Sequence, residues 1–126
     1  MGLNMYIHRP FDNTYLSMGY EDFFYTVCDD PGFIEEMMDF FTEDAVRLVE
    51  KIKGRGLTTI QIVDDIAYKN GLFINPDLFG KLWFPRMQKI MDPIHSLNIP
   101  VIFHSDGDVK HFIEMLIELG IHGVNP

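Results

Sequence analysis

Strand-like and helix-like segments alternate along this chain of 126 residues, and that alternation limits the possible folds more than any other feature. Short segments rich in aliphatic and β-branched residues predict strands at 3–8, 57–63, 99–104 and 121–125. Longer segments of helical period lie between them. Strands separated by such helices pair in parallel through right-handed crossovers. The order β-α-β-α-β-α-β therefore predicts an α/β fold with about four parallel strands.

Capping residues locate the first helices. The segment before residue 28 is expected to form one or two short helices broken near Gly19. The longest apolar stripe predicts a helix that begins at Asp29 or Asp30 and ends near the turn 54–56. Pro31 lies in its first turn, where a missing backbone N–H costs nothing.

Two further helices follow the same rules. One is expected over 75–97, with Asn75 as its cap. Pro85 lies inside this helix and should kink or split it, and Pro93 is a second such point. The other helix is expected over 108–120.

Charge and composition exclude several classes of protein. The net charge is −9, from 19 acidic and 10 basic residues, which suits neither nucleic acid nor an anionic membrane surface. The single cysteine, Cys28, permits no intrachain disulfide and fits the reducing cytoplasm. We find no signal peptide and no apolar run near the roughly 20 residues of a membrane span. One domain, residues 1–126, is expected.

Polar side chains gather where the predicted strands end. They are His8, Asp64, Asp65, His104, Asp106 and Asn125. Ligands of parallel α/β folds bind at the carboxyl ends of the strands, so these residues are candidates for a site. Along 57–63 the aliphatic face leads to Asp64 and the mixed face leads to Asp65. Asp65 is therefore expected to point into the site, whereas Asp64 caps or pairs.

Two stretches of the chain resemble the uroporphyrinogen decarboxylase family. The first, 58–109, has a strand ending in an acidic pair, then a long helix, then a strand ending in an Asp-Gly turn. The matching helix positions are Asn75, Pro76, Phe79, Phe84 and Pro85. The second, 8–24, resembles the family's Gly-Pro-containing segment. The resemblance implies part of a (β/α)8 barrel, from the middle of a fold that needs about 250 residues.

For a decarboxylase-like member, the resemblance assigns residue roles. Three residues would be catalytic: Tyr15 falls where the decarboxylases keep an active-site tyrosine, Asp65 where they keep a site serine, and Asp106 in their Asp-Gly turn. Asp64 matches an acidic position of the family. Together with His8, Arg9 and Asn125 at the strand ends, Asp64 would bind the substrate, a tetrapyrrole, without a cofactor. Arg9 is the one basic residue placed there, although a polycarboxylate calls for more positive charge.

For a methyltransferase-like member, the resemblance implies zinc and a methyl donor or corrinoid partner. His104 matches the family's zinc histidine, and Asp106 stands where the first cysteine ligand would be. Asp65 is the nearest third ligand. Two ligands make half a site, so stable zinc binding by this chain is not expected.

Three alternatives remain open at this point. Asp106 could cap the following helix, a role that Asp108 fits better, and Tyr15 could be a core residue. The chain could also be a non-catalytic fragment. Open sheet edges at 3–8 and 121–125 predict a homodimer or higher oligomer. The resemblance implies that the family's catalytic aspartate, its substrate-binding arginines and a late histidine lie in segments other than these 126 residues, which are therefore expected to catalyse neither reaction.

Overall fold

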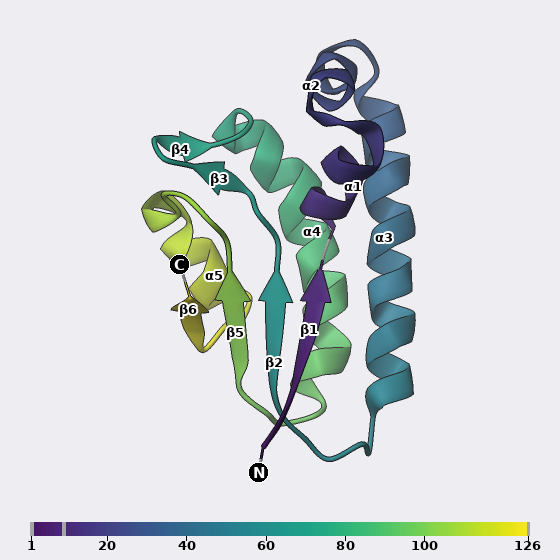
Figure 1. The fold of residues 1–126 in the computed structure, drawn as a ribbon, viewed down its shortest axis with the longest axis vertical. Helices are drawn as coiled ribbons and strands as arrows, with labels where there is room; N and C mark the ends of the chain where they lie inside the picture. The colour runs from purple at the N-terminus through teal and green to yellow at the C-terminus, as the bar shows by residue number, and fades with distance from the viewer. Residues whose placement is uncertain (1, 9, 126) are drawn as a thin grey trace.

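The computed structural model describes residues 2–8 and 10–125 and shows one four-stranded parallel sheet (Figure 1). Its strands are β1 (Leu3–His8), β2 (Leu57–Val63), β5 (Val101–His104) and β6 (Gly123–Asn125), adjacent in that order. All three pairings are parallel. The predicted strands and their parallel order are therefore confirmed. The edges of the sheet are β1 and β6, as the sequence predicts.

Five α-helices connect and cover the strands. They are α1 (Phe11–Met18), α2 (Tyr20–Asp29), α3 (Pro31–Ile52), α4 (Pro76–His95) and α5 (Ile113–Glu118). Gly19, at φ +88°, separates α1 from α2, as expected. The Asp30 side chain accepts the Phe33 N–H, and the Asn75 side chain accepts the N–H groups of Asp77 and Leu78. Both predicted caps are thus present.

Helix α4 runs without a split through both Pro85 and Pro93, so of the expected kink or split, the split does not occur. Its buried residues include Trp83, Met87 and Ile90, so packing holds the helix together where two backbone N–H groups are missing. Arg86 adds a polar link to α3. Its Nε lies 2.9 Å from Asp39 Oδ1, and its Nη2 donates to the Glu35 carbonyl.

The last helix begins later than predicted. Residues Lys110–Phe112 form a 3-10 helix, and α5 starts only at Ile113. Asp108 Oδ1 accepts the Lys110 N–H in the turn before the 3-10 helix, but neither this helix nor α5 has a side-chain cap, so the expected cap at Asp108 is absent. The Asp108 N–H donates to the Tyr68 carbonyl, which keeps residue 108 outside the helix.

Sequence reasoning missed a small antiparallel hairpin between β2 and α4. It consists of β3 (Ala67–Tyr68) and β4 (Gly71–Leu72). The turn is Lys69-Asn70, and Gly71 follows it at φ +135°; the Asn70-Gly71 pair is a turn signal that could have revealed it. Figure 1 shows this hairpin, α1 and α2 beyond the arrowheads of the strands.

The core lies between the sheet and its helices. Ile60, Ile62, Val101 and Phe103 are fully buried, as is Trp83 of α4. The alternate strand residues lie on the other face, where Tyr6 is 57% exposed. The polarity of the two faces of β2 is therefore as predicted. Among residues 2–8 and 10–125, no helix is long and apolar enough to cross a membrane.

Candidate functional site

The carboxyl ends of the four strands align in register. His8 of β1 pairs with Val63, Val63 with His104, and His104 with Asn125 of β6. Residues paired in this way place their side chains on the same face of a sheet. His8 and His104 therefore share the open face, with β2 between them.

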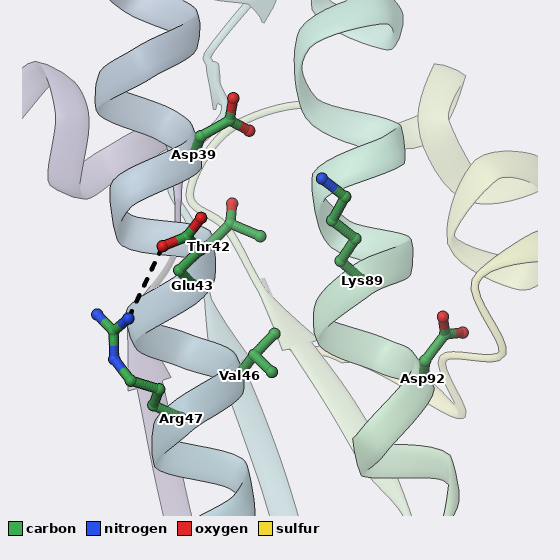
Figure 2. A pocket seen from close by; sticks show the side chains of 7 residues that line it. All are labelled: Asp39, Thr42, Glu43, Val46, Arg47, Lys89 and Asp92. Carbon is green, nitrogen blue, oxygen red and sulfur yellow. Dashed lines mark ion pairs between the residues drawn. The ribbon is translucent and has the colours of Figure 1, made fainter.

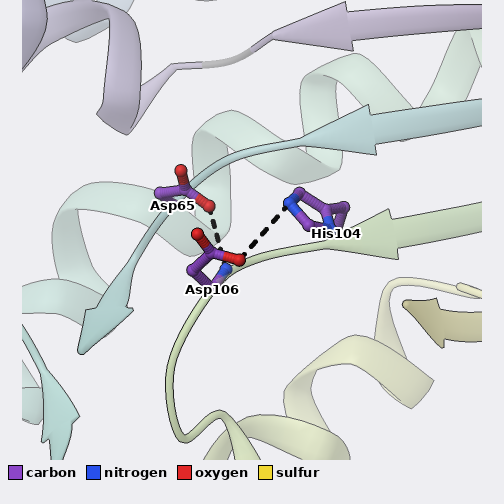
Figure 3. Close-up of side chains that lie close together, drawn as sticks. All are labelled: Asp65, His104 and Asp106. Carbon is purple, nitrogen blue, oxygen red and sulfur yellow. Dashed lines mark hydrogen bonds and ion pairs between the residues drawn. The ribbon is translucent and has the colours of Figure 1, made fainter. Parts of the chain in front are cut away.

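Three candidate residues meet at this edge. Asp65 follows β2, His104 ends β5, and Asp106 follows β5 (Figure 3). One ligand atom from each lies within 4.8 Å of the others. The Asp106 N–H donates to Asp65 Oδ1 over 2.9 Å, and His104 Nε2 lies 3.8 Å from Asp106 Oδ1. The side chain of His104 is 25% exposed and that of Asp106 is 79% exposed.

The backbone fixes the orientation of His104. Its Nδ1 lies 2.9 Å from the carbonyl oxygen of Asn125, which can only accept, so Nδ1 carries a proton. Nε2 then faces the Asp106 carboxylate. A neutral imidazole would direct its Nε2 lone pair at a negative oxygen. A second proton on the ring, or a cation between the two groups, removes that repulsion.

The loop that carries Asp106 is anchored on both sides. Ser105 is fully buried, and its hydroxyl accepts the Ile66 N–H and donates to the Asp106 carbonyl. Gly107 has φ +91°, and a Cβ there would lie 2.6 Å from backbone atoms of Ala67 and Tyr68. Glycine is thus required twice, for its dihedral angle and for the close approach of the hairpin.

Asp64 lies on the opposite, helix-facing side and is fully buried. Its carboxylate accepts the Phe11 N–H at 3.3 Å, the Asp12 N–H at 2.7 Å and the Trp83 indole N–H at 2.7 Å. Burial, followed by the charge of Asp12, raises the pKa of the Asp64 carboxyl well above its usual value. The geometry is that of the capping role which strand parity predicts.

Asp12 is a site residue that sequence reasoning missed. It is 2% exposed, and its Oδ2 lies 3.2 Å from His8 Nδ1. Burial raises the pKa of the Asp12 carboxyl, the hydrogen bond and charge of His8 oppose the rise, and Asp65 adds to it. An acid directly after the Pro10-Phe11 helix start was the available signal.

A family comparison places this geometry in context. The model of the family described as "Uroporphyrinogen decarboxylase (URO-D)" matches residues 6–126, nearly the whole chain. The chain belongs to the uroporphyrinogen decarboxylase family. No curated protein sequence matches it.

A solved structure agrees in fold with this family member. A methyltransferase from Methanosarcina mazei superposes with a TM-score of 0.79 at 19% identity. The match covers 98% of this chain and 35% of that methyltransferase. At this identity the likeness shows the fold alone. The four strands are thus an arc of a (β/α)8 barrel, and the chain spans about a third of the length of that methyltransferase.

The remaining residues that the family resemblance assigned are spread around this edge. Tyr15 is 3% exposed in an aromatic cluster and stacks on Tyr20 with ring centroids 4.9 Å apart. Burial, then the neighbouring Tyr20, raises the pKa of the Tyr15 hydroxyl, and Asp65 adds to the rise. Asn125 contributes its carbonyl oxygen to His104. Arg9 lies outside the described residues.

A separate hollow lies away from the strand ends. It measures about 600 Å³ and lies over α3 and α4 (Figure 2). Its lining comprises Asp39, Thr42, Glu43, Val46, Arg47, Lys89 and Asp92. Acidic and basic side chains both line the hollow, and Arg47 Nη1 lies 3.8 Å from Glu43 Oε2. None of the residues assigned from the sequence lies in it.

Proposed function

We propose that this chain is the metal-binding segment of a methyltransferase-type member of the uroporphyrinogen decarboxylase family. Asp65, His104 and Asp106 would be the protein ligands. The observation that supports this proposal is the convergence of their ligand atoms within 4.8 Å, from two adjacent strand ends. With Asp65 the set reaches three protein ligands, the number that catalytic zinc sites use.

The surroundings of the ligands fit a cation. A metal-binding histidine generally donates its other ring N–H to a carbonyl or carboxylate, and His104 does so to Asn125. Asp65 is likewise oriented by the Asp106 N–H. When bound, the cation would supply Lewis acidity that lowers the pKa of a coordinated thiol or water.

The donor set differs from the one that the family resemblance implies. A cysteine ligand is replaced by Asp106, so the site offers one nitrogen and carboxylate oxygens. Such harder ligands suit zinc, iron or manganese and lack the preference of thiolates for soft ions. We therefore expect weaker zinc selectivity than a thiolate site would give.

Metal titration of the 126-residue chain tests the proposal. We expect one equivalent of Zn²⁺ or Co²⁺ in calorimetry, and at least about tenfold weaker binding in Asp65→Asn, His104→Ala and Asp106→Asn. Asp77→Asn and His111→Ala are matched controls, because both side chains are exposed and lie outside the cluster. Absence of binding, or binding that the three variants leave unchanged, would refute the proposal.

Decarboxylation of a tetrapyrrole is the alternative that the resemblance implies. The carboxyl groups of Asp65 and Asp106 lie at this edge and disfavour a polycarboxylate substrate. We expect no turnover of uroporphyrinogen by the isolated chain. We also expect none of methylcobalamin with zinc and a thiol, since the chain spans about a third of the compared enzyme. Uroporphyrinogen turnover that Asp65→Asn abolishes would favour the decarboxylase instead.

A further inference from the structure

A second histidine stands at the same edge of the sheet, and its aspartate partner is buried. The His8 side chain is 59% exposed, whereas that of Asp12 is 3% exposed, and 3.2 Å separates Nδ1 from Oδ2. The pair thus has a buried carboxyl anchor and an imidazole open to solvent. Because Nδ1 faces the carboxyl, Nε2 is the atom left for another partner.

Hydrogen bonds to core residues hold Asp12 in place. The Asp12 N–H donates to Asp64 Oδ1, and Asp64 is fixed in turn by the Trp83 indole. The Asn13 side chain donates to the His8 carbonyl and ties β1 to α1. Such support keeps the His8 ring where the strand end places it.

Asp12 has a feature that a purely structural pair would not need. Its second oxygen, Oδ1, is buried and accepts no hydrogen bond from the described residues. Burying an unpaired carboxyl oxygen is costly, and such exceptions call for an explanation.

We propose that His8 is the acid–base residue of the strand-end site and that Asp12 is its positioning residue. This inference rests on the proposed metal site. A thiol or water molecule bound there would give its proton to His8 Nε2. The bonding electron pair would stay on sulfur or oxygen, and the Asp12 carboxylate would hold the imidazolium. Register places His8 on the same face of the sheet as His104, with β2 between them.

The test uses the Co²⁺-loaded chain and does not depend on a substrate. The visible spectrum, followed against pH, reports the ionisation of a solvent molecule on the ion. We expect His8→Ala and Asp12→Ala to move this midpoint upward by about one pH unit, the effect of one hydrogen bond to a charged group. His111→Ala is the control and should leave it in place. If His8→Ala still binds Co²⁺ but its midpoint is unchanged, the inference is overturned and the proposed metal site still stands.

Nitrogen NMR of the imidazoles gives a second readout. In the parent chain we expect the ring proton of neutral His8 to lie on Nδ1. The proton should stay there in Asp12→Asn, because asparagine keeps an acceptor oxygen, and should leave Nδ1 in Asp12→Ala. If circular dichroism shows that His8→Ala folds poorly, His8→Asn replaces it. An unshifted midpoint in His8→Asn would count equally against the inference. A proton on Nε2 in the parent chain would overturn the inference. Failure of the parent chain to bind Co²⁺ refutes the proposed function, and the acid–base role with it.

Discussion

Asp64 and Asp65 are neighbours in sequence, yet they lie in opposite environments. Asp64 is fully buried on the helix side, where three N–H groups donate to its carboxylate. Asp65 lies on the open face, joined to Asp106 and close to His104. The pleat of β2 explains the difference, because successive side chains point to opposite faces. The same residue type therefore stabilises the fold at one position and is available to a ligand at the next.

Removal of the Asp64 carboxylate should have the largest effect on stability. Asp64→Ala leaves three buried donors without an acceptor, so we expect a loss of about 3 kcal/mol or more in the free energy of unfolding. Asp65→Ala should cost about 1 kcal/mol or less, since it loses one hydrogen bond at the rim. Urea unfolding followed by Trp83 fluorescence measures both. Equal losses in the two variants would contradict the contrast.

The loop beneath Asp106 gives the next largest effect. Gly107 and Gly19 both have φ near +90°, but only a Cβ at Gly107 would meet backbone atoms within 3 Å. We expect Gly19→Ala to cost about 1 kcal/mol for the dihedral angle alone, and Gly107→Ala about 2 kcal/mol. Thermal unfolding provides the comparison. A Gly107→Ala penalty no larger than that of Gly19→Ala would show that the hairpin does not pack closely on this loop.

The pH dependence of stability should depend on the buried acid Asp64. The pKa of Asp64 is raised from its ordinary value of 3.8, mainly by burial. The folded state therefore holds the proton more tightly, and the contribution of Asp64 is lost as pH rises from about 4 through the raised pKa. We expect the fall in unfolding free energy between pH 4 and 7 to be smaller in Asp64→Asn than in the parent chain. An identical slope in Asp64→Asn and in the parent chain would refute this.

The smallest effect concerns association through the open side of the sheet. We propose that the chain forms a homo-oligomer, because β1 and β6 are unpaired edges and Tyr6 is 57% exposed. Tyr6→Lys should weaken association by about tenfold in sedimentation equilibrium, since Lys on an edge strand opposes pairing. Tyr25→Lys is the control, because Tyr25 is 65% exposed on α2, away from the edge. A monomeric parent chain at micromolar concentration would rule out the oligomer.

Much of the fold could be predicted because local signals agree with the tertiary structure. Caps at Asp30 and Asn75 start α3 and α4 where the sequence places them. Of the two effects expected of Pro85, a kink or a split of α4, the split does not occur, because tertiary packing outweighs the lost hydrogen bond. Residue 108 lies before α5, and its N–H donates to the Tyr68 carbonyl, 40 positions away. Such a contact leaves no periodic trace in the sequence.

The sequence by itself determined the strand order, the face on which Asp65 lies and the gathering of acids and histidines at one edge. These follow from periodicity and from the direction of parallel strands, which are local or topological properties. Only the tertiary structure decided that Asp65 lies within 4.8 Å of His104 and Asp106, and that Asp12 is buried beneath His8. Distances between side chains on different strands depend on register and on loop conformation. Long-range packing sets both, here through Ser105, Gly107 and the Asp64 carboxylate.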